Sequence, residues 1–148
     1  MSKLIVAEFR FTPEPHIDPT NRKVYRYVDR PYVRIRLEYG KNISATPVTC
    51  LIDSGCDFNL FPAHWGETLG IAIEDGEPVN YMGIGNSGLK AYTHKVKIHI
   101  EGTAINFVTA IDFSKDQQTP LLGRSGFFGY FKKITFEEEN NKFVLAFK

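Results

Sequence analysis

Hydrophobic residues in this chain recur mainly at every second position, which is the period of a β-strand with one buried face. Within residues 23–39, apolar side chains occupy alternate positions from Val33 to Leu37, and the positions between them are charged. Residues 91–100 repeat this alternation with Val, Ile and Ile opposite Lys, Lys and His. Both segments are therefore predicted to be half-buried strands.

The remaining pattern also predicts mostly strands. Further strands are expected at residues 4–11, 48–52, 103–113, 134–138 and 143–147. Residues 12–22 are predicted to be a loop, because Pro13 and Pro15 cannot donate a hydrogen bond to a sheet. Two short helices are predicted, one at residues 62–69, where a Pro stands at the start and a Gly follows the end, and one at residues 125–131.

Composition limits the class of protein. A chain of 148 residues with 43% hydrophobic residues is long enough for one domain with its own core. With a net charge of +1, the chain has no large excess of positive charge to attract nucleic acid or an anionic membrane surface. No apolar run approaches the roughly 18 residues of a membrane span, and the N-terminus has no signal-peptide core. We therefore expect a cytoplasmic protein with neither a nucleic-acid nor a membrane partner.

The thiols and imidazoles do not form a metal pattern. Cys50 and Cys56 are too isolated for a zinc site, and the four histidines fall on separate predicted elements. We expect no metal and no cofactor. Cys50 is predicted to pack in the core. Cys56 is expected to pack as well, with an oxidation-sensitive role as the alternative.

The most informative motif is Asp53-Ser54-Gly55, which follows the apolar strand at residues 48–52. Such a sequence holds a carboxylate on a tight turn, since Ser54 can bond to nearby groups and Gly55 lets the chain turn. A carboxylate acts as a catalyst when its pKa is perturbed, most strongly by a second carboxylate. The chain contains no second Asp-Ser-Gly or Asp-Thr-Gly. A catalytic partner must therefore come from another chain; the alternative is a structural turn capped by its own Asp.

Two further segments follow this motif. Residues 81–90 (YMGIGNSGLK) contain three glycines between strand-like flanks. Taken alone they are an ordinary hairpin turn, and they lack the Lys-Ser/Thr of a phosphate-binding loop. Residues 119–124 (TPLLGR) form a second apolar strand that ends in Gly-Arg and precedes an aromatic-rich segment.

These three segments, in this order, resemble the retropepsin-like aspartic proteases, which are single-domain homodimers. The resemblance covers residues 31–148, and the insert at residues 61–71 is closer to the cellular and bacterial branch than to the compact viral enzymes. It implies one domain over residues 1–148, with residues 1–30 as an N-terminal arm or extra strands. The implied fold is all-β: a pepsin-like closed half-barrel with one or two short helices, which dimerises to a full aspartic protease.

The implied function is that of an aspartic endopeptidase, which cleaves a peptide or protein substrate with water activated by an Asp dyad across a homodimer. The alternative is a non-catalytic protease-fold module for peptide binding or dimerisation. The resemblance assigns the catalytic motif to Asp53, Ser54 and Gly55. It favours the C-terminal strand over the N-terminal one as the source of a sheet shared between subunits.

The resemblance also assigns supporting residues. Substrate binding falls to Leu51, Asp57, Gly83, Ile84, Gly85 and Leu121, of which the three in the glycine-rich segment belong to a flap over the substrate. Arg124 is implied to support the site through an ion pair with Asp57, with its stem partly buried; the alternative is two unrelated surface charges. Leu51, Ile84 and Leu121 would otherwise be packing residues. Cys56 and Ser125 depart from the usual family residues.

Overall fold

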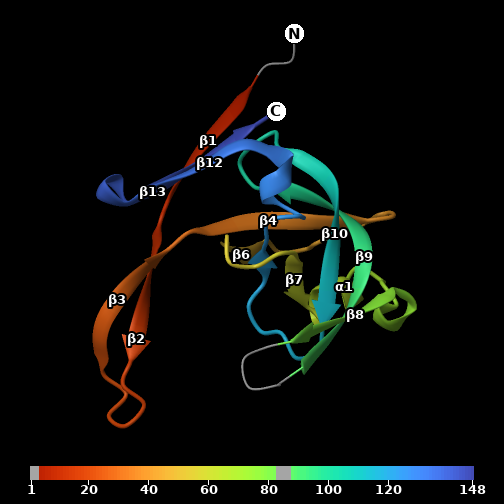
Figure 1. Cartoon of the computed structure of the whole chain (residues 1–148), viewed down its shortest axis with the longest axis horizontal. Coiled ribbons are helices and arrows are strands. Elements are labelled where there is room, and N and C mark those ends of the chain that lie inside the picture. The colour runs from red at the N-terminus through yellow and green to blue at the C-terminus, as the bar shows by residue number, and fades with distance from the viewer. Residues whose placement is uncertain (1–3, 83–87) are drawn as a thin grey trace.

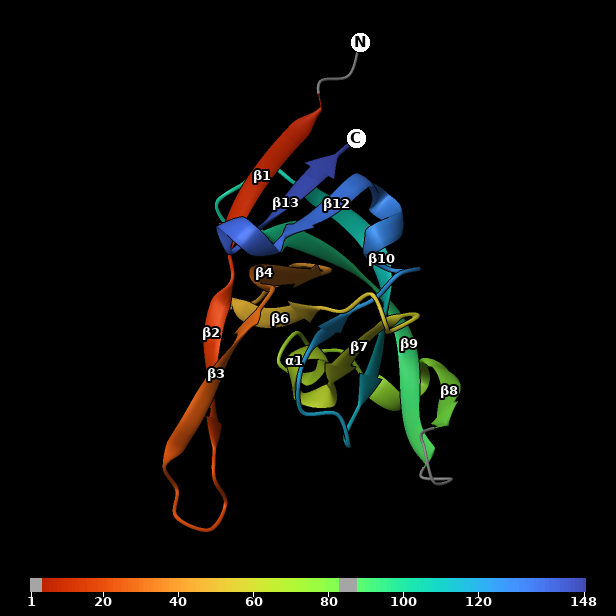
Figure 2. The same cartoon turned by 60° about the vertical axis from the view of Figure 1, so that its left-hand side comes forward.

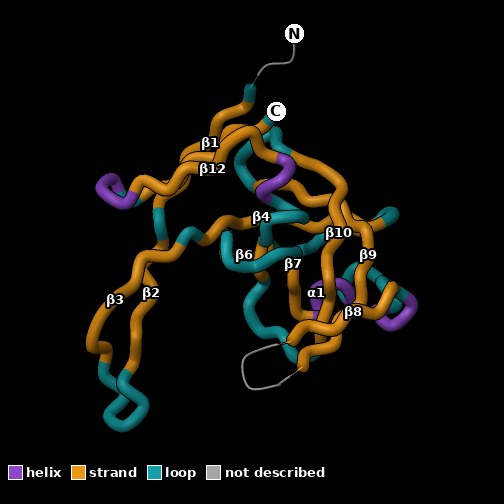
Figure 3. The backbone as a smooth tube through the Cα atoms, viewed as in Figure 1, coloured by secondary structure: helices purple, strands orange, loops and turns teal. Residues whose placement is uncertain are grey.

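The computed structural model describes residues 4–82 and 88–148 of the chain. Within these ranges the protein consists mainly of β-strands (Figure 3). The strands are Ile5–Arg10 (β1), Thr12–Ile17 (β2), Val24–Arg30 (β3), Tyr32–Tyr39 (β4), Asn42–Ile43 (β5), Val48–Ile52 (β6), Asn59–Pro62 (β7), Glu77–Met82 (β8), Gly88–Ile100 (β9), Asn106–Ser114 (β10), Leu121–Leu122 (β11), Phe131–Glu137 (β12) and Lys142–Phe147 (β13). The helical segments are Ala63–Glu67 (α1) and single 3₁₀ turns at Ile73–Asp75, Phe128–Tyr130 and Glu138–Asn140.

Six strands close into a barrel in the order β4-β6-β11-β7-β10-β9, because β9 also pairs with β4 (Figure 1). The barrel is mixed, since β6 is parallel to β11 and β7 is parallel to β10. Closure gives each of these six strands a paired neighbour on both sides over at least part of its length. This confirms the predicted all-β closed half-barrel.

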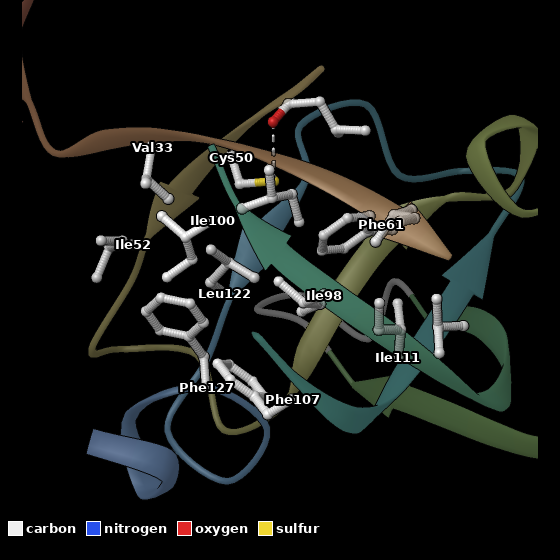
Figure 4. Packing of buried hydrophobic residues seen from close by; sticks show 14 of the residues in the cluster. Val33, Cys50, Ile52, Phe61, Ile98, Ile100, Phe107, Ile111, Leu122 and Phe127 are labelled. Carbon is white, nitrogen blue, oxygen red and sulfur yellow. Dashed lines mark hydrogen bonds between the residues drawn. The ribbon is translucent and has the colours of Figure 1, made fainter. Parts of the chain in front are cut away.

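The barrel interior is filled by the residues that the alternation predicted. Val33, Ile35 and Leu37 on β4 are at most 1% exposed. Figure 4 shows Ile98 of β9 and Phe61 of β7 in the same cluster. Each such side chain stabilises the fold by roughly 1.5–3 kcal/mol relative to an exposed position. The alternation of apolar and polar residues thus correctly predicts which face of these strands is buried.

Cys50 lies in this cluster and is fully buried, as predicted. Burial raises the pKa of its thiol well above the usual value, because a thiolate would be desolvated there. Cys50 is therefore a small apolar core residue.

The two ends of the chain form a separate three-stranded sheet in the order β1-β13-β12 (Figure 2). The expectation that the C-terminal strand supplies a sheet shared between subunits is corrected here. Strand β13 bonds to β1 on one side and to β12 on the other, so both of its edges are filled within one chain. The outer edge of β1 pairs with no strand in the described part of the chain.

Residues 12–22 are not a loop throughout, contrary to the prediction. Strand β2 pairs with β3 in a two-stranded ribbon that projects from the barrel (Figures 1 and 2). A two-stranded ribbon tolerates Pro13 and Pro15, because each strand has an outer edge where no ladder bond is required. The predicted strand at residues 23–39 is also divided, since β3 ends and β4 begins on either side of Pro31.

One of the two predicted helices forms as expected. Helix α1 starts directly after Pro62, and Gly70 follows it with a φ of +84°, a conformation that favours glycine. The second is reduced to the 3₁₀ turn Phe128–Tyr130. The aromatic rings on either side of that turn, Phe127 and Phe131, pack at 4.8 Å in the core.

Candidate active site

Asp53 stands directly after the end of β6 and is half-buried. Its backbone N–H donates to the carbonyl of Leu122 at 2.9 Å, and its carbonyl accepts the N–H of Cys56 at 3.1 Å. The N–H of Gly55 donates to Oδ1 of Asp53 at 2.9 Å. The carboxylate is therefore held by a local Asx turn, while Oδ2 accepts no hydrogen bond from the residues that the structure describes.

Strand order explains why this turn meets the Gly-Arg segment. Strand β11 lies between β6 and β7, parallel to the first and antiparallel to the second. The loop at residues 53–58 joins β6 to β7 and must therefore pass over the end of β11. Leu51 and Leu121, both assigned to substrate binding, are direct neighbours in the β6–β11 register and are half-buried.

Backbone bonds join the Asp53 loop to the turn after β11. The N–H of Arg124 donates to the carbonyl of Cys56 at 2.9 Å, and the N–H of Ser125 donates to the carbonyl of Asp57 at 2.8 Å. Gly123 allows this approach, because a Cβ there would lie 2.3 Å from the carbonyl oxygen of Phe58. The two loops therefore form one rigid unit.

The side chains of Asp57 and Arg124 do not form the expected ion pair. Both residues are exposed, and no salt bridge joins them in the single chain. Their backbones already fix the loop junction, so the charged groups are free to extend into solvent.

Asn59 is a site residue that sequence reasoning missed. It is fully buried, and its Oδ1 accepts the N–H of Gly123 at 3.0 Å. Its Nδ2 donates to the carbonyl of Gly126 at 2.9 Å and to that of Ala110 at 3.1 Å. The sequence feature that could have indicated its role is an amide side chain at the start of the otherwise apolar segment Asn-Leu-Phe-Pro, six residues after Asp53.

The other assigned residues differ in their surroundings. Ser54 and Gly55 are exposed, and the Ser54 hydroxyl has no hydrogen-bond partner within residues 4–82 and 88–148. The assigned flap residues Gly83, Ile84 and Gly85 lie outside the described residues.

Cys56 is partly buried beside Asp53, and its Sγ donates to the carbonyl of Phe58 at 3.0 Å. Burial raises the pKa of this thiol, and the neighbouring carboxylates of Asp53, Asp57 and Asp112 raise it further. Reactive cysteines need an electropositive setting that lowers the pKa. The acidic surroundings therefore favour packing over the oxidation-sensitive alternative.

Neither a metal cluster nor a membrane helix occurs in the described ranges. No group of three His, Cys, Asp or Glu side chains there is arranged to hold a metal ion. No helix within those ranges is long and apolar enough to cross a membrane.

Comparison with known proteins gives a clear result only at the level of structure. No family model and no curated protein sequence matches the chain. A retropepsin-like aspartic protease from Rickettsia conorii matches with a TM-score of 0.62 at 14% identity, over 99% of this chain and 97% of that one. The chain has the retropepsin-like fold. EIAV protease complexed with the inhibitor HBY-793 also matches, with a TM-score of 0.48 and 18% identity, over 73% of this chain and 88% of that one.

The retropepsin-like fold extends further along the chain than its sequence motifs do. The motifs support a resemblance over residues 31–148, whereas the match to the bacterial structure covers 99% of the chain. Within this fold Asp53 stands at the end of β6, and the pairing of β6 with β11 brings the Asp53 loop against the turn that follows β11.

Proposed function

We propose that this chain is an aspartic endopeptidase, which hydrolyses peptide bonds with a water molecule activated by two Asp53 carboxylates, one from each subunit of a homodimer. The observation that carries the proposal is the setting of Asp53. A retropepsin-like half-barrel holds its backbone and one carboxylate oxygen by hydrogen bonds and leaves Oδ2 without a partner among the described residues.

The chemistry follows from the pairing of two such carboxylates. At a separation of about 3 Å they cannot both ionise, so they share one proton and titrate as a unit. The ionised carboxylate takes a proton from water while the water oxygen attacks the peptide carbonyl carbon. The protonated carboxyl donates a hydrogen bond to the carbonyl oxygen, and a proton then passes to the amide nitrogen as the C–N bond breaks.

A homodimer is required because the chain has one Asp-Ser-Gly motif. A two-fold interface places the same residue of each subunit at the axis, which turns one Asp53 into two. We assign β1 to this interface, since it is an edge strand of the terminal sheet and carries the exposed apolar residue Val6. Val6 of β1 and Leu4, the residue before this strand, are 56% and 48% exposed, as expected for apolar residues that a second copy covers.

The test is cleavage of a denatured protein from about pH 3 to about pH 7, with and without a transition-state inhibitor of aspartic proteases. Asp53→Asn should lower turnover by at least about 10²-fold, because an amide cannot act as the base. Asp75→Asn is the matched control, since it makes the same chemical change at an exposed residue of a distant 3₁₀ turn.

Inhibitor-sensitive cleavage that Asp53→Asn abolishes and Asp75→Asn retains would support the endopeptidase. Equal cleavage by the parent and the purified Asp53→Asn variant would overturn the assignment of Asp53. No cleavage by the parent at any pH would favour a non-catalytic binding or dimerisation module.

A further inference from the structure

The ribbon formed by β2 and β3 stands outside the hydrophobic core (Figures 1 and 2). None of its residues, 12–30, is buried, and none belongs to the core cluster of the described chain. Within residues 4–82 and 88–148, β2 and β3 pair only with each other. The rest of the described chain therefore leaves most of the ribbon surface uncovered.

Polar contacts hold the base of the ribbon but not its outer part. At the base, Arg30 and Tyr32 donate to the Glu14 carboxylate at 2.8 and 2.9 Å. As far as the chain is described, residues 15–28 form hydrogen bonds only within the ribbon. A two-stranded ribbon by itself is marginally stable in water, because it buries too little apolar area. The outer part therefore gains stability from any second surface that covers one of its faces.

Large apolar side chains gather on this exposed ribbon. Tyr25 and Tyr27 are two positions apart on β3, so their side chains point to the same face, and Pro15 lies opposite Tyr27 in the register. Tyr25 is 59% exposed and Tyr27 is 65% exposed, and Ile17 and Val24 near the tip are exposed as well. Tyrosine is enriched at protein interfaces, because its ring buries a large area while its hydroxyl tolerates water. The Tyr25–Tyr27 face is therefore a candidate contact surface.

The ribbon continues the strand that we assign to the subunit interface. Only Phe11 separates β1 from β2, and its side chain is buried in the core. Figures 1 and 2 show β1 and the ribbon along the same side of the barrel. A second copy that covers Val6 on β1 therefore lies next to the ribbon.

The size of the interface also requires more than β1. A stable interface buries about 800 Å² of each partner and takes about 20–30 residues from each. Strand β1 has six residues, which is too few. Together β1 and the ribbon span residues 5–30, which reaches the size that a stable dimer needs.

We propose that the β2–β3 ribbon is a dimerisation arm, whose Tyr25–Tyr27 face packs on a second copy of this chain beside the β1 contact. The inference rests on the homodimer of the proposed function and adds the surface that holds its subunits together. The ribbon lies outside residues 31–148, where the retropepsin-like motifs are found. Because the dimer is two-fold symmetric, each subunit gives one arm and receives one, so one substitution removes two contacts.

The test compares Tyr27→Lys with Tyr39→Lys. The second variant makes the same chemical change at the last residue of β4, the end of that strand farther from the ribbon, where the ring is 39% exposed. Sedimentation equilibrium gives the dissociation constant of each dimer. Tyr27→Lys should raise this constant at least about 10-fold, because an aromatic anchor is replaced by a charge in both subunits. Tyr39→Lys should change it by less than about 2-fold.

Hydrogen exchange of the unmodified chain covers the case in which Tyr27→Lys disorders the ribbon. When the protein concentration is raised through the dissociation constant at fixed pH, amides of residues 24–30 should exchange at least about 10-fold more slowly. Exchange in the β4–β5 hairpin, residues 39–43, should stay the same, since this hairpin lies at the other end of β4.

The outcomes separate the ribbon from the catalytic proposal. A dimer that Tyr27→Lys leaves intact, with no concentration-dependent protection of residues 24–30, would overturn the arm while the endopeptidase stands. A dimer that depends on the ribbon but cleaves no protein would support the arm and count against the endopeptidase. A chain that stays monomeric at every concentration would overturn the arm and the shared dyad together. Impaired cleavage by Tyr27→Lys with an unchanged dissociation constant would assign the ribbon to the protein substrate and overturn the arm.

Discussion

The side chain of Asn59 accepts the backbone N–H of Gly123 at 3.0 Å, and this bond joins the start of β7 to the turn after β11. Asn59 is fully buried, so neither group has water as an alternative partner. The turn that Asn59 holds is the one that is bonded to the Asp53 loop through Cys56 and Asp57. The buried amide of Asn59 therefore helps to hold the candidate catalytic loop in position.

Asn59→Ala should lower the free energy of unfolding by about 3 kcal/mol, because it leaves the buried N–H of Gly123 without an acceptor and removes donors from two carbonyls. Asn106→Ala is the control, since Asn106 is exposed and its side chain donates to the nearby carbonyl of Ala104. It should cost less than about 0.5 kcal/mol. Urea unfolding measures both, and equal effects would contradict the role of Asn59.

Gly123→Ala should lower the stability of the protein, because the new Cβ would lie 2.3 Å from the carbonyl oxygen of Phe58. We expect a loss of about 1–3 kcal/mol in unfolding free energy and a displaced Asp53 loop. At Gly129 the nearest atom to an added Cβ is 3.6 Å away, so Gly129→Ala is the matched control. Thermal unfolding and peptidase assays of both variants check this, and an unperturbed Gly123→Ala would refute the contact.

Tyr81→Phe should destabilise the fold by about 1–3 kcal/mol, since it removes one of the two hydroxyl donors of the buried Asp112. Burial raises the pKa of the Tyr81 phenol, and its bond to Asp112 raises it further. The phenol therefore stays protonated and donates a hydrogen bond throughout the pH range of the assays. Tyr39→Phe removes a phenol that is 39% exposed and serves as the control. Similar unfolding free energies for the two variants would show that the Asp112 network adds no stability.

The β2–β3 ribbon should weaken at acid pH through Glu14. Arg30 and Tyr32 donate to this carboxylate at 2.8 and 2.9 Å and lower its pKa below the usual 4.5. A carboxyl with a lowered folded-state pKa adds stability that is present above 4.5 and is lost as the pH falls through the folded-state value. The effect should be small, because the pair is more than a third exposed.

Glu14→Gln should therefore speed amide hydrogen exchange in residues 24–30 relative to the parent above about pH 5, and the difference should disappear below about pH 3. Comparison at equal pH cancels the intrinsic pH dependence of exchange. A difference that grows as the pH falls would have the wrong sign for this pair.

Peptidase activity should depend on protein concentration, because each subunit supplies one Asp53 to the site. Specific activity should fall when the enzyme is diluted through the dissociation constant of the dimer, and the sedimentation coefficient should fall over the same range. Val6→Lys, at the exposed edge of β1, should move both transitions to higher concentration. Activity that stays constant on dilution to a proven monomer would exclude a shared dyad.

Much of this protein is determined by sequence alone. The burial of Val33 and Leu37 follows from period-2 alternation, since neighbouring side chains of a strand point to opposite faces. The Asp53 turn is equally local, because Oδ1 bonds to the N–H of a residue only two positions away. The order of the motifs was also enough to indicate the retropepsin-like fold.

Only the tertiary structure decided which distant groups meet. Insertion of β11 between β6 and β7 brings Asn59 to Gly123, and pairing of β8, β9 and β10 brings Tyr81 to Asp112. Strand β2 forms despite Pro13 because its ribbon has an outer edge, which is a property of the sheet and not of the segment. These contacts join residues far apart in the chain, so their formation depends on the packing of the whole barrel rather than on local sequence.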